Sequence, residues 1–170
     1  MSVRSEFAFV LGVYPNARGI AFVIFEGPGC LIDWGMRGAR RHGHDQLVDA
    51  VARLVDQYWP PIIVLQDMST FGTRRSERIR SLNEAIKRYA EERGVPVSCH
   101  SRTEVHAAFA SVNARTKAAI AAAIAARVPA LERHLPPPRK PWMSEHASMG
   151  IFDAAALALT FLSNAGFAIE

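Results

Sequence analysis

The sequence has little cysteine and no long apolar run, and each scarcity excludes a class of protein. Its two cysteines, Cys30 and Cys99, each lie within an apolar stretch. That placement fits reduced core thiols better than a disulfide or a zinc site. The longest apolar candidate, residues 154–162, is about half of the roughly 18 residues that span a bilayer, and the first residues show no secretory pattern. We therefore expect a soluble, cytoplasmic protein with no membrane partner.

The sequence also lacks a large excess of charge of either sign. Twenty Lys and Arg against sixteen Asp and Glu give a net charge of +4, with 49% apolar and 21% charged residues. This composition excludes disordered and fibrous chains, and the length suits one domain over residues 1–170. The mild positive excess is compatible with nucleic acid as a partner. A glycine-rich phosphate loop is missing, which argues against an ATP-binding protein.

The order of apolar patterns predicts a mixed α/β fold. Three short apolar segments separated by turn residues, at 7–13, 20–25 and 30–36, predict an antiparallel meander. Helical spacing follows over 47–58, and the unbroken apolar run at 62–65 is typical of a parallel strand covered on both faces. The remaining patterns predict helices at 76–93, 103–110, 113–127 and 150–164, and a strand at 95–99. We expect a five-stranded mixed sheet with helices on both faces.

Two acidic residues stand where this sheet and the last helix could form a site. Asp67 follows the buried strand at its carboxyl end, and Asp153 lies in the first turn of the apolar last helix. Each has a plainer role, because a strand-end Asp bonds the next amides and a helix-start Asp caps its helix. Brought together, the two carboxylates would hold Mg²⁺ or Mn²⁺. Glu145 and His146, just before that helix, are further candidate ligands, although a loop Glu is more often exposed or ion-paired.

Basic residues gather after the strand-end loop. They are Arg74, Arg75, Arg78 and Arg80. Because Arg opposes the dipole at the start of a helix, this cluster favours contact with phosphate over a solvated helix end paired with Glu77. Phe71, in the same loop, either stacks on an unstacked base or packs on the neighbouring helix. Lys117, early in the alanine-rich helix, is either solvated or turned toward phosphate.

Three motifs in this order resemble the RuvC-like Holliday-junction resolvases of the ribonuclease H-like superfamily. Residues 10–21 are similar to the first hairpin of that family, residues 62–67 to its fourth strand ending in an acid, and residues 153–160 to its closing Asp-Ala-x-Ala-Leu-Ala helix. The resemblance covers about residues 7–162. It implies a ribonuclease H-like fold, a homodimer, branched DNA as partner, and a phosphodiester-cleaving site with Mg²⁺ or Mn²⁺.

The resemblance also assigns positions in that metal site. Asp67 corresponds to the second acid of the family and Asp153 to the last. Tyr14 stands where the family has its first-strand Asp, and Gly150 stands where it has an acid or His. A neutral phenol is a poor ligand for Mg²⁺, so the site is degenerate unless the loop residue Glu145 completes it.

These patterns leave three functions open. The first is a metal-dependent endonuclease for branched or structured DNA that uses Asp67, Asp153 and Glu145, with His146 as a further ligand. The second is a module that binds nucleic acid without cleaving it. The third is a dimeric scaffold, in which the long helix from Ser76 pairs with its symmetry mate.

Overall fold

A five-stranded mixed sheet forms the centre of the computed structural model, which describes residues 9–38, 43–69 and 75–170. Its strands are β1 (Val10–Asn16), β2 (Gly19–Phe25), β3 (Leu31–Gly38), β4 (Ile62–Gln66) and β5 (Val97–His100). They lie in the order β3-β2-β1-β4-β5. The first three strands pair antiparallel, and β4 is parallel to both β1 and β5. The predicted meander, and the central parallel strand beside it, are confirmed.

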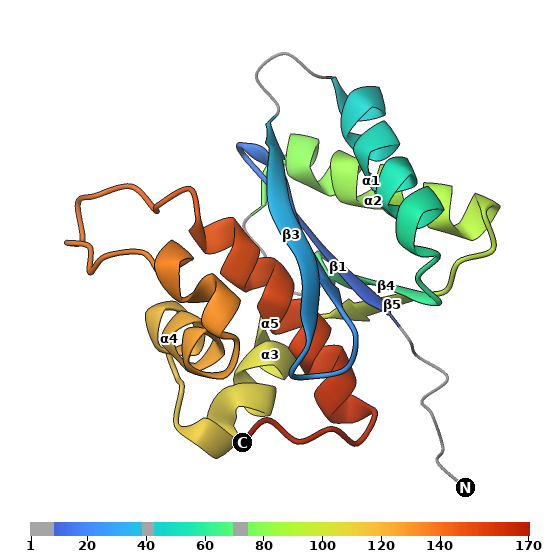
Figure 1. The fold of residues 1–170 in the computed structure, drawn as a ribbon. Helices are drawn as coiled ribbons and strands as arrows, with labels where there is room; N and C mark the ends of the chain where they lie inside the picture. Colours follow the sequence, from blue (N-terminus) through green and yellow to red (C-terminus); the bar gives the residue numbers. More distant parts are fainter. Residues whose placement is uncertain (1–8, 39–42, 70–74) are drawn as a thin grey trace, which may run out of the picture.

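Helices cover both faces of this sheet (Figure 1). They are α1 (His44–Tyr58), α2 (Glu77–Glu92), α3 (Arg102–Phe109), α4 (Lys117–Arg127) and α5 (Met149–Asn164), with short 3-10 helices η1 (Ala110–Val112) and η2 (Pro129–His134). One apolar core joins the sheet to α1 and α2, and the other joins it to α3, α4 and α5. The predicted arrangement of helices on both faces is therefore confirmed.

Helix α5 crosses β1 at backbone contact. A Cβ added to Gly12 would lie 2.6 Å from the carbonyl oxygen of Ala154, and one added to Gly150 would lie 2.8 Å from Nδ2 of Asn16. Helix α5 and strand β1 therefore cross in close contact, and the amino-terminal end of α5 lies beside the carboxyl end of β1. This close approach brings the first turns of α5 to the carboxyl-terminal half of β1, which holds Tyr14.

Some boundaries and one burial differ from expectation. The helix predicted from 113 begins at Lys117, because Asn113 takes a left-handed conformation and Thr116 then caps α4 by accepting from the Ala119 amide. Cys30 is exposed and Cys99 half-buried, so the prediction of two core thiols is wrong for Cys30, which lies in the turn before β3. Both cysteines are free. Within the described ranges, every helix is too short or too polar to cross a membrane.

Candidate functional site

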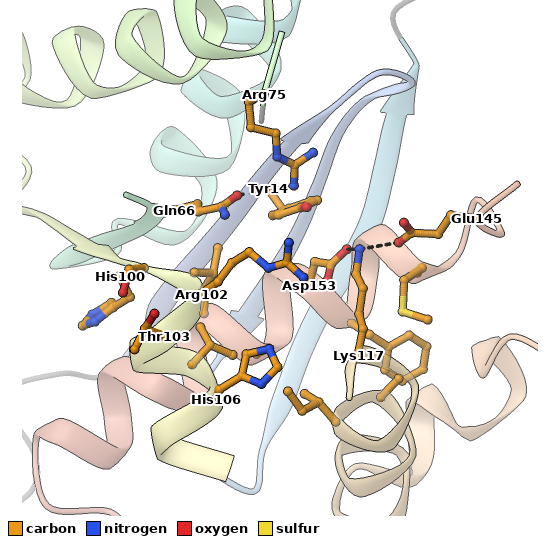
Figure 2. Close-up of a pocket in the computed structure, with 18 of the residues that line it drawn as sticks. Tyr14, Gln66, Arg75, His100, Arg102, Thr103, His106, Lys117, Glu145 and Asp153 are labelled. Atoms are coloured by element: carbon orange, nitrogen blue, oxygen red, sulfur yellow. Dashed lines mark hydrogen bonds and ion pairs between the residues drawn. The ribbon is translucent and has the colours of Figure 1, made fainter. Parts of the chain in front are cut away.

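A pocket of about 760 Å³ lies where the carboxyl ends of the central strands meet the first turns of α3, α4 and α5 (Figure 2). Tyr14 comes from β1 and Gln66 from β4, whereas Arg102, Lys117 and Asp153 come from the three helices. The carboxyl edge of parallel strands is where α/β folds place their ligands. The position of this pocket therefore makes it the candidate site.

Lys117, the first residue of α4, lies between two carboxylates. Its Nζ atom is 3.0 Å from Oδ2 of Asp153 and also forms an ion pair with Oε1 of Glu145. Figure 2 shows the ammonium group reaching from α4 to both acids. The backbone carbonyl of Glu145 in turn accepts a hydrogen bond of 3.0 Å from the Arg18 guanidinium, which fixes this loop to the turn between β1 and β2. One cation of the protein itself thus pairs with both acids of the pocket.

Asp153 is the more buried of these two acids. Its side chain is 14% exposed, against 38% for Glu145. Burial raises the pKa of Asp153 to about 6, although Lys117 opposes that rise. Asp153 is the fifth residue of α5, so the plainer role proposed for it, that of capping the first turn, is wrong. Its ionised form depends on the neighbouring lysine instead.

Tyr14 lies between two cations. The Arg75 guanidinium carbon is 4.8 Å from the centre of the phenol ring, and Nζ of Lys117 is 5.9 Å from it. Arg75 also donates a hydrogen bond of 3.4 Å to Oε1 of Gln66. Burial lowers the pKa of Arg75, whereas Asp153 and Glu145 oppose this. At the first-acid position, an aromatic ring therefore contacts positive side chains through its π electrons.

Asp67 does not join this site, contrary to the sequence prediction. Its Oδ1 accepts hydrogen bonds from the Ser69 amide at 2.9 Å and the Ser69 hydroxyl at 2.6 Å, which lower its pKa. The preceding residue, Gln66, lines the pocket in its place. Side chains alternate along a strand, and Val64 packs in the core on the α5 side, so Gln66 shares that side and Asp67 takes the other. Extending this alternation one residue beyond the apolar run 62–65 would have found Gln66.

The other predicted residues separate into three groups. Glu145 and Lys117 lie in the pocket. His146 is exposed and does not line the pocket, and its Nδ1 lies 2.7 Å from the Ser148 hydroxyl. Arg78 and Arg80 are exposed on α2, away from the pocket lining, and Arg80 lines a neighbouring hollow that shares Arg75 with the pocket. Phe71 and Arg74 fall outside the described residues.

Two arginines of the pocket were not singled out by the motifs. Arg102 is the first residue of α3, whose cap Ser101 accepts from the Glu104 amide at 3.1 Å. Arg139 follows three prolines, which is the one signal that the sequence offered for it. With Arg75 and Lys117, the lining holds four strongly basic side chains against the two acids that Lys117 already pairs. The pocket therefore has an excess of positive charge.

The pocket does not fit the two divalent ions that the resemblance implies. Within the described ranges, no three His, Cys, Asp or Glu side chains gather closely enough to hold a metal ion. Glu145 and Asp153 share the ammonium of Lys117, and a Cβ at position 150 would lie 2.8 Å from Nδ2 of Asn16, so a side chain there would require Asn16 to move. Mg²⁺ prefers several oxygen ligands at near-octahedral geometry, which this set does not supply.

Comparison with solved structures identifies the fold. Thermus thermophilus RuvC matches at a TM-score of 0.64 with 20% identity, covering 94% of this chain and 98% of that one. The yeast mitochondrial Holliday junction resolvase Ydc2 matches at 0.56 with 15% identity, over 90% of this chain and 78% of the other. The fowlpox virus resolvase, solved with Holliday junction DNA, matches at 0.54 with 14% identity, over 91% and 99%.

No family model matches the chain, and no curated protein sequence does. The likeness to solved structures nevertheless spans nearly the whole chain, and it establishes a RuvC-like resolvase fold. The fold that the three motifs implied is confirmed.

Proposed function

We propose that this chain binds the phosphate backbone of branched or structured DNA in its pocket and does not cleave it by a two-metal mechanism. The observation that carries the proposal is the position of Lys117, whose ammonium ion-pairs with both acids of the pocket. The two carboxylates are thereby unavailable as ligands for a metal. The three arginines around them keep their positive charge for an anion.

The charge and shape of the pocket support phosphate as its ligand. Arg75, Arg102 and Arg139 line it together with Lys117. First turns of three helices border the same space, and amino-terminal helix ends favour anions through their unpaired amides and dipoles. Arg78 and Arg80, exposed at the start of α2, extend this surface in the proposal.

Branched DNA is proposed because of the fold. RuvC from Thermus thermophilus and the fowlpox virus resolvase were both solved in complex with a Holliday junction. Their fold is the fold of this chain, and the pocket lies at its central strands. We therefore propose the ligand of these proteins, junction DNA, for this chain, but not cleavage of that DNA.

Binding to a four-way junction, measured by fluorescence anisotropy in EDTA, tests this proposal. Arg102→Ala should weaken binding about tenfold and lower the slope of log affinity against log salt by about one, because one phosphate contact is lost. Arg53→Ala is the matched control, since Arg53 is an exposed arginine of α1 on the other face of the sheet. Equal affinity of both variants and the wild type would overturn the proposal.

A metal-dependent endonuclease remains the second candidate, because Asp153 and Glu145 converge on one cation position. Titration of the protein with Mn²⁺ by calorimetry separates it from the first. We expect no binding to the wild type. Heat of binding that Asp153→Asn abolishes would instead favour the endonuclease, with Asp153 as a ligand and a metal in place of Lys117.

A further inference from the structure

Residues 135–144, here called the Trp142 loop, form the first part of the connection from η2 to α5. This loop stands away from the body of the molecule, as the orange segment of Figure 1 shows. Trp142 in this loop is 77% exposed, and its neighbour Met143 is 48% exposed. Exposure alone does not single out Trp142, because Trp59 is equally exposed. What distinguishes Trp142 is the set of groups around it.

Cations border this indole. Nζ of Lys140 lies 5.2 Å from the centre of the Trp142 ring. Arg139 donates a hydrogen bond of 2.6 Å from Nη1 to the carbonyl of Met143, which holds the turn together. The ten residues 135–144 contain these two basic residues and no acid. The loop therefore presents one large aromatic surface beside two positive charges.

The Trp142 loop is continuous with the pocket. Arg139 lines the pocket and also bonds within the loop, so one side chain belongs to both. Lys140 is the next residue after Arg139, and its Nζ lies beside the Trp142 ring. A nucleic-acid strand held at Arg139 would therefore have a second cation and an indole close by.

We propose that Trp142 stacks on an unpaired base of the nucleic acid bound in the pocket, with Arg139 and Lys140 on the flanking phosphates. An aromatic ring beside cations matches a base joined to phosphate, because stacking and charge then act on the same nucleotide. A purely apolar partner would leave both cations without a counterpart. The inference rests on the proposed function, since it needs nucleic acid in the pocket.

The test places 2-aminopurine at an unpaired position of a forked DNA and follows its fluorescence as the full chain binds. Stacking on an indole should quench this base, and Trp142→Ala should remove the quenching and weaken binding about tenfold. Trp142→Phe should restore part of both effects because it keeps an aromatic face. The affinity of Trp142→Ala for fully paired duplex should differ from that of the wild type by less than twofold.

Trp59 supplies a matched control. It is also 77% exposed, but it caps α1, which covers the other face of the sheet. Trp59→Ala should leave quenching and affinity unchanged. If the two alanine variants behave alike, or if Trp142→Ala weakens duplex and forked DNA equally, stacking by Trp142 is wrong.

Arg102→Ala, measured on the same DNA, separates this inference from the proposed function. If it weakens binding while Trp142→Ala has no effect, the pocket binds DNA and only the stacking role fails. If neither variant changes the affinity, the pocket does not hold DNA and both proposals fail. Quenching that persists in Trp142→Ala also overturns the stacking role.

Discussion

At Lys117, a single ammonium group is shared by the carboxylates of Asp153 and Glu145. Replacing it with alanine leaves a mostly buried acid without its cation. The pKa of Asp153 should then rise above about 6, since Lys117 lowers it. Lys117→Ala should lower the free energy of unfolding at pH 7 by about 1–2 kcal/mol, a value reduced because the lysine is partly exposed.

Urea unfolding of Lys117→Ala at pH 7 and pH 5 checks this prediction. The loss should shrink at pH 5, where Asp153 takes up a proton. Lys117→Ala combined with Asp153→Asn should recover much of the lost stability. Equal loss at both pH values would show that the lysine acts through packing alone.

Asp153 itself should make the folded state less stable as the pH rises. Its folded pKa of about 6 lies above the ordinary 3.8, so the folded state holds the proton more tightly than the unfolded chain does. The stability lost between about pH 4 and pH 6 corresponds to about 3 kcal/mol at most. We expect Asp153→Asn to gain stability over the wild type between pH 4 and pH 7 in urea unfolding.

The pKa of Asp67 shifts in the opposite direction to that of Asp153, so its effect on stability should have the opposite sign. Hydrogen bonds from Ser69 hold the pKa of Asp67 below 3.8, so the stability it contributes is present above that pH and is lost as the pH falls through the lowered value. Asp67→Asn should therefore be less stable than the wild type at pH 7, with the difference closing in acid. Changes of the same sign in both variants would contradict the assigned environments.

One strand position accounts for the main error of the sequence prediction at this scale. Asp67 attracted attention as the acid at the end of a buried strand, yet alternation places Gln66 in the pocket. Tyr14, which a motif in the hairpin placed at the candidate site, does line the pocket. Its contacts with Arg75 and Lys117 could not be predicted, since they join residues distant in sequence.

Among the elements, α5 sets how much room the site has. A Cβ at Gly150 would lie 2.8 Å from Asn16 Nδ2 and 3.1 Å from the Ala21 Cβ. Gly150→Asp would introduce an acid at the position where the resembled family has an acid or His. It should lower the free energy of unfolding by about 1–3 kcal/mol through overpacking. Thermal unfolding measures it.

Gly150→Ala is the control for this substitution, because it adds the same Cβ without a charge. We expect it to cost nearly as much as Gly150→Asp. A stable Gly150→Asp variant would mean that α5 can move away from β1, and the argument that the site has no room for this ligand would be wrong.

Helix α3 presents Arg102 to the pocket through its cap. Ser101 accepts from the Glu104 amide, and Glu104 also bonds His100 at 2.7 Å, which ties the helix to β5. Ser101→Ala should cost about 1 kcal/mol of stability in urea unfolding. It should also weaken junction binding, although Ser101 carries no charge, because the first turn that holds Arg102 loosens. Unchanged junction affinity in Ser101→Ala would show that the cap does not position Arg102 for binding.

Most elements were predictable from periodicity, and the boundaries were set by local chemistry that periodicity does not read. Asn113 in a left-handed turn delays α4 to Lys117, and this is what makes Lys117 the first residue of its helix. The alanine-rich pattern alone predicts one helix that starts at Asn113 and continues through Lys117. The start of α5 at Met149, one residue before the predicted start, likewise places Asp153 fifth in the helix and past its first turn.

For the whole molecule, a net charge of +4 conceals an uneven distribution. Within the described residues, basic side chains from the segment before α2, from α3, α4 and the Trp142 loop meet at one pocket. These segments are spread over 75–139, so only the fold brings them together. The sequence could indicate a nucleic-acid partner, but it could not locate the surface.

The homodimer implied by the resemblance stays a prediction at this scale. The described large apolar side chains that are exposed lie outside α2, on β3, on the Trp142 loop, at Trp59 and near the C-terminus. A dimer through α2 would therefore depend on polar contacts and should be weak. Light scattering across a concentration series measures it, and a dimer that persists at low micromolar protein would contradict this expectation.

The most direct measurement of the central claim is a titration of a labelled four-way junction with the wild-type chain, in EDTA and in Mn²⁺, with the products run on a denaturing gel. We expect the junction to bind in both conditions, with a steep loss of binding as salt is added, and no product strand in either. Product that forms in Mn²⁺ with the wild type and not with Asp153→Asn would contradict this expectation.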